Sequence, residues 1–298
     1  MAPTLQPPIA RVGIIAKKGL LEAATHLVDI EAWLERRAVT AVFEHHTATL
    51  MPRCDARAVA EKREMVADVG MVLVLGGDGT LLGMADCIGE AGSSIPILGV
   101  NFGSLGFLTE ITLPELYPSL EAALTGHVHL EERAMLRGLT QRQATTYSRH
   151  VALNDVVITK AARARMVDLS IWVGDEFMTR VRADGLIIAT PTGSTAYNLA
   201  AGGPIVHPTV DALTVTPIAP HTLTNRPVVI PSGTTVRVQP TMTGRDEVYV
   251  TFDGQAADQL EPGDEIVVAL AEMRLRLIKP TTRSYFQVLR AKLKWGER

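Results

Sequence analysis

The chain has 298 residues, a length that predicts two domains. Its formal net charge of -3 excludes an overall positive field that would attract nucleic acid or an anionic membrane. Apolar residues make up 47% and charged residues 20%, as in soluble proteins with a buried core. Its two cysteines, Cys54 and Cys87, are too few for a disulfide framework and lack metal-ligand spacing. We therefore expect a reducing compartment, the cytoplasm.

Residues 185–210 are uncharged over a length that would span a membrane. Pro191, Pro204 and Pro208 interrupt this stretch, and hydroxyl and amide side chains fill much of it. Such a segment would leave backbone groups that lipid cannot satisfy. The first ten residues hold three prolines and lack the apolar segment of a signal peptide. We expect no membrane association.

The first 125 residues alternate short apolar runs with amphipathic stretches. A helix is expected after the first apolar run, another from Thr80, and a third that Thr112 caps with Pro114 just inside its start. This alternation predicts an α/β domain over residues 1–125 with a doubly wound, Rossmann-like parallel sheet. The expected strands are Val12–Ala16, Val39–Phe43, Met71–Leu75 and Pro96–Val100.

From residue 126 onward short β-rich runs dominate, so a mainly β domain is expected over residues 126–270. Gly174–Asp175 is typical of a two-residue hairpin turn, and a helix is expected near Ser194. A last helix near Ser284 is apolar on one face, so residues 271–298 are expected to return to the first domain. The expected strands are Val128–Leu130, Leu136–Thr140, Val151–Thr159, Val167–Val173, Phe177–Val181, Val228–Ile230, Thr235–Val238, Val248–Phe252 and Ile266–Leu270.

A glycine-rich turn, Gly76–Thr80, directly follows the strand expected at Met71–Leu75. Glycine lets the backbone approach a phosphate closely, and the start of the next helix offers free N–H groups and a positive dipole end. Asp78 within this turn suits a base, or a partner for a hydroxyl group or Mg²⁺. The plainer interpretation is a tight turn in which Asp78 caps the helix. Neither Gly-x-x-x-x-Gly-Lys-Ser/Thr nor Gly-x-Gly-x-x-Gly matches this turn.

Polar residues gather again in the second half of the chain. Asn154–Asp155 interrupts an apolar run, which costs stability unless both side chains find partners. Residues 190–204 are rich in hydroxyl groups, small side chains and glycine, a composition that suits ribose and adenine. A helix capped by Ser or Thr and flanked by turns is the plainer interpretation of that stretch.

Taken together, these segments resemble the NAD kinase family over nearly the whole chain. Lipid kinases of the diacylglycerol and sphingosine type share the glycine turn, so the other segments in the same order make the resemblance specific. The segments that carry it are Gly76–Thr80, Asn101–Leu108, Asn154–Asp155, Arg182–Gly185, Pro191–Pro204, His221–Pro227 and Phe252–Gln255.

The resemblance implies a two-domain fold, an NAD cleft between the domains, and transfer of the ATP γ-phosphate to the 2′-hydroxyl of the adenosine ribose of NAD. It implies that Asp78 is the catalytic proton acceptor. Family members use Mg²⁺ and form homo-oligomers, here a dimer or tetramer; the metal ligands stay open, as does polyphosphate in place of ATP. The implied NAD-binding residues are Asp78, Gly79, Asn154, Asp155, Arg165, Arg182, Asp184, Thr192, Thr195, Ala196, Tyr197, Asn198, Leu199, Ala200 and Gln255.

Two other functions remain open from the residues alone. A lipid kinase with the same turn would need an apolar or membrane-binding surface, and the chain has no basic amphipathic helix of the interfacial kind other than the last one. A non-catalytic NAD sensor would have no need of Asp78. Neither nucleic acid nor a membrane is expected as a partner.

Overall fold

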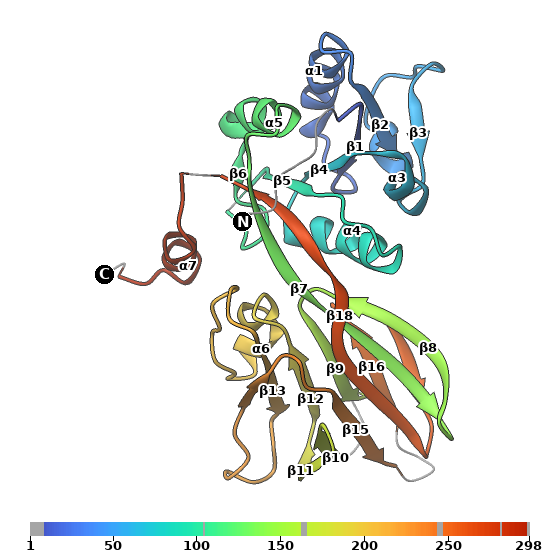
Figure 1. Cartoon of the computed structure of the whole chain (residues 1–298), viewed down its shortest axis with the longest axis vertical. Coiled ribbons are helices and arrows are strands. Elements are labelled where there is room, and N and C mark those ends of the chain that lie inside the picture. The colour runs from blue at the N-terminus through green and yellow to red at the C-terminus, as the bar shows by residue number, and fades with distance from the viewer. Residues whose placement is uncertain (1–8, 104, 162–165, 243–246, 281, 297–298) are drawn as a thin grey trace. The chain divides into compact units, whose positions relative to one another are not determined.

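The computed structural model describes residues 9–103, 105–161, 166–242, 247–280 and 282–296 (Figure 1). It divides into two compact units. The first comprises Met1–Glu132 and Leu275–Arg298, and the second comprises Arg133–Arg274. The arginine predicted at position 165 lies outside the described residues. Within the described residues, no helix is long and apolar enough to cross a membrane.

The first unit is built on a parallel sheet whose strands lie in the order β3-β2-β1-β4-β5 (Figure 1). The chain moves outward from β1 in one direction through β2 and β3, and in the other through β4 and β5. The order of the strands therefore reverses between β1 and β4, where open α/β sheets bind their ligands. The bounds are β1 Arg11–Ala16, β2 Thr40–Glu44, β3 Ala58–Ala60, β4 Met71–Leu75, β5 Ile97–Asn101 and β6 Ile111–Thr112.

Helices cover both faces of this sheet, which confirms the doubly wound α/β prediction. A Cβ on Gly13 or Gly99 would press on Met65 or Leu81, so two of the helices, α3 and α4, pack closely on one face. Apolar residues of α1 and α5 share a core with the opposite face. The bounds are α1 Ala23–Glu35, α2 His45–Ala48, α3 Lys62–Asp68, α4 Asp78–Glu90, the 3-10 helix η1 Leu113–Glu115 and α5 Leu116–Leu124.

Two predictions made from local sequence patterns in the first unit are confirmed. The strand predicted at Met71–Leu75 has these bounds, and all five residues are buried. Thr112 forms a capping box with Glu115 at the predicted helix start. The helix expected from Thr80 begins two residues earlier, at Asp78, because Gly77 occupies the N-cap position. Asp78 is thus in the first turn and does not act as the cap.

The second unit is mainly β, as predicted, and its strands pair antiparallel. One sheet has the order β14-β13-β12-β9-β16-β17, and apolar residues from it share a core with β10, β11, β15 and β18. The predicted Gly174–Asp175 turn joins β10 to β11. The bounds are β7 His129–Arg142, β8 Thr145–Ala152, β9 Asp155–Lys160, β10 Val167–Val173, β11 Glu176–Ala183, β12 Gly185–Ala189, β13 Ala212–Ile218, β14 Val228–Pro231, β15 Val236–Thr241, β16 Val248–Phe252, β17 Gln255–Leu260 and β18 Asp264–Lys279.

Three predicted strand boundaries were wrong. Val128–Leu130 and Leu136–Thr140 are not separate strands: β7 runs from His129 through both, because the charged residues between them occupy strand positions. The run Val151–Thr159 is two strands: β8 ends at Ala152 and β9 begins at Asp155. The run Ile266–Leu270 is the middle of β18, which continues to Lys279 despite its charged residues.

The C-terminal segment belongs to the first unit, as predicted. The end of β18 pairs in parallel with β5 through Leu277 and Ile278. The last helix, α7 (Tyr285–Leu293), begins with Ser284 in a capping box with Gln287. Its Val288 and Leu289 are buried.

Candidate functional site

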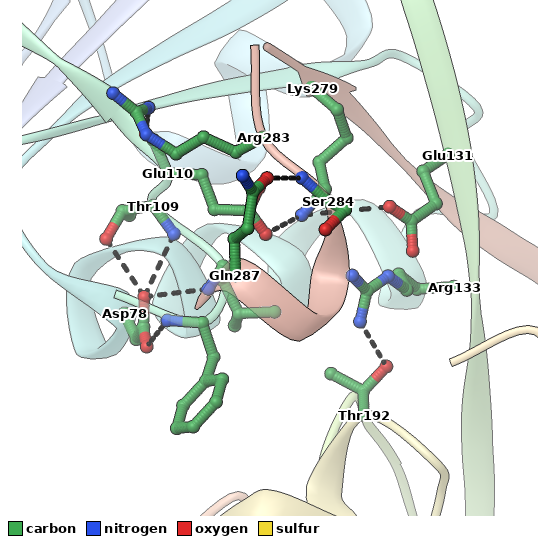
Figure 2. Close-up of polar contacts among 12 residues, drawn as sticks. Asp78, Thr109, Glu110, Glu131, Arg133, Thr192, Lys279, Arg283, Ser284 and Gln287 are labelled. Atoms are coloured by element: carbon green, nitrogen blue, oxygen red, sulfur yellow. Dashed lines mark hydrogen bonds and ion pairs between the residues drawn. The ribbon is translucent and has the colours of Figure 1, made fainter. Parts of the chain in front are cut away.

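Asp78 is held by the loop that follows β5 (Figure 2). Its Oδ1 accepts hydrogen bonds from the N–H groups of Leu108 and Thr109 at 3.1 and 3.0 Å, and from the Thr109 hydroxyl at 2.9 Å. Its Oδ2 accepts the N–H of Phe107 at 2.8 Å. Four donors therefore fix the orientation of one half-buried carboxylate.

Gly106 makes room for this arrangement. A Cβ at this position would overlap Oδ1 of Asp78 and the hydroxyl of Thr109. The loop also closes on itself, because the Gly106 N–H donates to the Thr109 carbonyl at 3.1 Å. A glycine is therefore required where the loop passes over the carboxylate.

The C-terminal segment braces the same loop from the other side. Lys279, at the end of β18, forms a buried ion pair with Glu110, the residue after Thr109 (Figure 2). Arg283 donates to the Glu110 carbonyl at 2.8 Å and to both carboxylate oxygens of Glu115. Burial works against ionisation of Glu115, but hydrogen bonds from Thr112 and Arg283 outweigh it and lower the pKa of Glu115 to about 2. Ionic contacts and hydrogen bonds from the C-terminal segment therefore hold in place the loop that binds Asp78.

In the second unit, Asp253 holds the backbone at the start of β9. Its carboxylate accepts the N–H groups of Leu153, Asn154 and Asp155 at 2.7, 2.7 and 3.0 Å. Asp253 lies in the turn between β16 and β17 with a φ of 49°, and its own N–H donates to the Asp155 carbonyl. The chain therefore changes direction between β8 and β9 without leaving these backbone donors unpaired.

Asp155 is an acid in a nearly closed environment. Only 4% of it is exposed, and no hydrogen bond to its carboxylate is found among the described residues. Burial, together with the nearby charge of Asp253, raises the pKa of Asp155 to about 7. This side chain therefore changes its charge near neutral pH.

The turn that begins at Thr190 is docked on the same backbone. The N–H of Thr190 donates to the Asn154 carbonyl at 2.9 Å, and its hydroxyl donates to the Leu153 carbonyl at 2.6 Å. The same hydroxyl accepts the N–H of Gly193 at 3.0 Å. A Cβ on Gly193 would overlap the backbone of Asn154. The hydroxyl-rich turn and the Asn154–Asp155 pair thus form one structural element.

Family models match both units of the chain. The model described as ATP-NAD kinase N-terminal domain matches residues 12–128, and the ATP-NAD kinase C-terminal domain matches residues 153–280. The chain belongs to the NAD kinase family. These matches support phosphorylation of NAD over the lipid kinase and sensor alternatives.

Relatives in this family are similar over nearly their full length. The NAD kinase of Geobacter sp. (strain M21) is 45% identical over 288 residues, which are 97% of this chain and 99% of the relative. That of Geobacter sulfurreducens is 50% identical over 271 residues, covering 91% and 93%. The curated NAD kinases thus match both units and the segment that returns from the second to the first.

Two solved structures have the same fold. Yeast NADH kinase complexed with NADH superposes with a TM-score of 0.88 at 25% identity, covering 98% of this chain and 89% of that one. An NAD kinase from Archaeoglobus fulgidus in complex with ATP gives 0.73 at 25% identity, with 94% and 99% covered.

The residues that the NAD kinase resemblance singled out fall into different environments. Tyr197 is 46% exposed, and Thr195 and Ala196 are half-buried beside it. Asn198 is fully buried: its amide donates to the carbonyls of Ser194 and Pro204 and accepts from the hydroxyls of Thr214 and Thr216. Its side chain therefore stabilises the protein interior. These residues belong to the 3-10 helix η2 (Gly193–Thr195) and to α6 (Tyr197–Ala200), with Ala196 between them. In α6, Leu199 is half-buried and Ala200 is exposed.

The remaining predicted residues lie near the ends of strands or at the start of a helix. Thr192 is buried, and its hydroxyl accepts from Arg133 at 3.3 Å (Figure 2). Arg182 is exposed on β11, and Asp184, at the next turn, pairs with Lys160 at 3.5 Å. Gln255 is exposed at the start of β17, and Gly79 is exposed in the first turn of α4.

Sequence reasoning missed the side chains that position others. Asp253 lies within a segment that matches the family and Thr190 directly precedes one, yet their hydrogen bonds to Leu153–Asp155 depend on pairings distant in sequence. The one local signal was Asp253–Gly254, a dipeptide typical of a hairpin turn that sits between two apolar runs.

Proposed function

We propose that this chain transfers the γ-phosphate of ATP to the 2′-hydroxyl of the adenosine ribose of NAD, with Asp78 as proton acceptor. As a member of the NAD kinase family, the chain phosphorylates NAD at the expense of ATP. What remains to be tested is the hydroxyl that is modified and the residue that takes its proton.

The fixed carboxylate of Asp78 is the observation that carries this proposal. Three of its four hydrogen bonds fall on Oδ1, so Oδ2 accepts from Phe107 alone and retains capacity for a further donor. Its neighbours Gly77 and Gly79 border a cavity of about 450 Å³ at the ends of β1 and β4. A carboxylate that needs no reorientation is well suited to general base catalysis.

The proposed step balances without a covalent intermediate on the protein. The ribose oxygen forms a bond to the γ-phosphorus, the bond between that phosphorus and the β,γ-bridging oxygen breaks, and ADP leaves. The hydroxyl proton passes to Oδ2 of Asp78. Because phosphoryl transfer depends mainly on positioning and on charge neutralisation, the protein needs to contribute little else.

We expect Mg²⁺ to arrive with ATP. Among the described residues, no group of three His, Cys, Asp or Glu side chains could hold a metal ion. Mg²⁺ usually keeps several waters and is bound by substrate phosphates with one or two carboxylates. The donors present therefore fit a nucleotide-borne ion, which would neutralise phosphate charge.

The second unit is proposed to bind NAD. The predicted residues here are Asn154 and Asp155 at the start of β9 and Thr192 and Thr195 in the docked turn, of which Asn154 and Thr195 are half-buried and the other two buried. Tyr197 exposes an aromatic face of the kind on which adenine stacks. The predicted set also includes Arg182, Asp184 and Gln255, which are polar and at least partly exposed.

A cytoplasmic location and a homo-oligomer complete the proposal. Both described cysteines are free thiols, which fits a reducing compartment. Light scattering of the purified protein tests the oligomer, and a mass of about 32 kDa would contradict it.

Replacing Asp78 tests the catalytic role. Asp78→Asn keeps an acceptor for the loop but removes the base, so kcat for NADP formation should fall by about 10²–10⁴-fold. NADP is measured with an NADP-specific dehydrogenase in the presence of Mg²⁺, ATP and NAD. Retention of more than half the activity would exclude this role.

Thr109→Val is the matched control, because it removes one hydrogen bond to the same carboxylate and leaves the charge. It should lower the melting temperature while kcat stays within about tenfold of the original value. If both variants lost activity equally, Asp78 would act by ordering the loop.

A further inference from the structure

The loop that holds Asp78 leaves the sheet after β5 and returns to it at β6. Its two ends are neighbours, because the end of β5 pairs in parallel with β6. The three N–H groups that donate to Asp78 belong to residues 107–109, close to the returning end. Whatever fixes the returning end therefore also fixes these donors.

Glu110 is the anchor of that end, and its side chain points into the protein. Only 4% of it is exposed, and its carboxylate pairs with the ammonium group of Lys279 (Figure 2). Lys279 is the last residue of β18, which pairs with β5 through Leu277 and Ile278. A second carboxylate, that of Glu131, lies 3.7 Å from the same ammonium group. The position of Glu110 is thus set by a strand from the end of the chain.

Thr109 connects this anchor to the carboxylate. It lies on the sheet, because a Cβ on Gly99 of β5 would be 3.3 Å from the Thr109 Cα. Its hydroxyl donates to Asp78 at 2.9 Å and accepts from the Asn101 amide at 3.1 Å. The sheet limits the movement of Thr109 on one side, and Glu110 is the next fixed point along the chain.

Stability alone does not account for a buried ion pair at this place. Removing two charges from water costs free energy that their attraction often does not recover, and apolar side chains of similar size hold such a position equally well. An ion pair differs from an apolar contact because the ammonium group has to meet the carboxylate, which disfavours other arrangements. The pair of Lys279 and Glu110 is therefore suited to fixing an orientation.

We propose that Lys279 and Glu110 are positioning residues for the reaction, and that their ion pair fixes the N–H groups of residues 107–109 so that the carboxylate of Asp78 faces the acceptor hydroxyl. The proposal rests on the role proposed above for Asp78. It requires no contact of either residue with NAD or ATP. A misplacement of about 1 Å, even one caused far from the reacting atoms, costs on the order of 100-fold in rate.

The test variant replaces both members of the pair, Glu110→Leu together with Lys279→Met, so that neither charge is left buried without the other. Its melting temperature should stay within a few degrees of the original, because an apolar pair of similar size takes the place of the ions. Well below that temperature, kcat for NADP formation should fall about 10- to 100-fold, whereas KM for NAD and KM for ATP should stay within twofold. An unchanged kcat would overturn the proposal.

Glu110→Gln is a milder second variant. It keeps the shape of the side chain and an acceptor for the ammonium group, and it removes only the negative charge. It should give a smaller loss of kcat in the same direction, again with both KM values within twofold. It tests the proposal independently if the double substitution prevents folding, and a normal kcat would then contradict the positioning role.

The matched control makes the same chemical change on the same strand. Arg276, three residues before Lys279 on β18, pairs with Glu132 of β7 at 3.3 Å. Glu132→Leu together with Arg276→Met should leave kcat within twofold of the original. An equal loss in the control and in the test variant would mean that any charge lost from β18 lowers the rate, and the assignment to the loop would fail.

Combination with Asp78→Asn shows through which group the pair acts. Once the base is absent, its orientation no longer matters, so Glu110→Leu with Lys279→Met should lower the remaining kcat by less than about twofold. A purely structural loss would instead multiply with that of Asp78→Asn. A further loss of full size would therefore show that the pair does not act through Asp78.

Hydrogen exchange of the peptide that covers residues 105–112 adds a measurement that needs no turnover. Exchange should be at least about tenfold faster in the test variant and unchanged in the control; unchanged exchange with a reduced kcat would exclude the loop as the route. If Asp78→Asn loses activity but the test variant keeps both kcat and slow exchange, the positioning role fails and the function stands. If Asp78→Asn keeps its activity while the test variant exchanges faster, the role of Asp78 fails and the ordering of the loop by the ion pair survives.

Discussion

The stability of Asp155→Asn relative to the original, unliganded protein should increase as pH rises from acid to above neutral. Asp155 is buried beside Asp253, and the pKa of its carboxyl rises from 3.8 to about 7, first through burial and then through the charge of Asp253. The folded protein therefore binds a proton that the unfolded chain has already released between these two values. Its stability falls as pH rises through this window and is constant above it.

The magnitude follows from the size of the shift. About three pKa units correspond to on the order of 4 kcal/mol, which the folded protein loses between pH 4 and pH 8. An asparagine cannot ionise and avoids this loss. The difference in unfolding free energy between Asp155→Asn and the original protein should therefore grow by up to about 4 kcal/mol across that range. A pH-independent cost of burying the amide cancels in this comparison.

Chemical denaturation at pH 4.5, 6 and 8 measures that difference. A background with Trp33→Phe and Trp295→Phe leaves Trp172, on β10, as the fluorescent reporter of the second unit. Asp175→Asn, in the exposed β10–β11 turn, makes the same chemical change at the surface and should show a flat difference. If the Asp155→Asn difference were equally flat, or shrank as pH rises, the buried acid would not be perturbed as argued.

Two further substitutions address the two units separately. Gly106→Ala places a methyl group on Oδ1 of Asp78, so it should lower both the melting temperature and kcat; normal values of both would show that the loop has room to spare. Tyr197→Ala removes an aromatic side chain that is 46% exposed, so stability should change by less than about 1 kcal/mol while KM for NAD rises. An unchanged KM for NAD would place the adenine elsewhere.

Much of the fold could be predicted because its signals are local. The buried run Met71–Leu75 and the capping pattern at Thr112 depend on neighbouring residues, and both appear as expected. Two of the three boundary errors came from long strands, β7 and β18, whose charged residues interrupt the apolar pattern. Charged side chains tolerate strand positions where one face is open or where an opposite charge lies near, as Glu132 and Arg276 show at 3.3 Å.

The hydrogen bonds that position the side chains of the site could not be predicted from local sequence. Asp78 bonds to residues about thirty positions away, and Asp253 to residues about a hundred positions away. The family resemblance implies that Asn198 binds NAD, and the structure shows that its amide accepts from Thr214 and Thr216 on β13. Which polar side chain faces inward depends on the strand packed against it, and the local sequence does not specify that strand.

Each unit uses one carboxylate to gather three consecutive backbone N–H groups: Asp78 at residues 107–109 and Asp253 at residues 153–155. Hydrogen bonding alone therefore does not distinguish a base from an anchor. Their surroundings differ in a way that supports the proposed role of Asp78: Asp253 lies close enough to Asp155 to disfavour a second negative charge, whereas the residues on either side of Asp78 border a cavity lined by three lysines. An attacking hydroxyl beside bound phosphate needs a negative acceptor close to positive charge, and among these two anchors only Asp78 offers that combination.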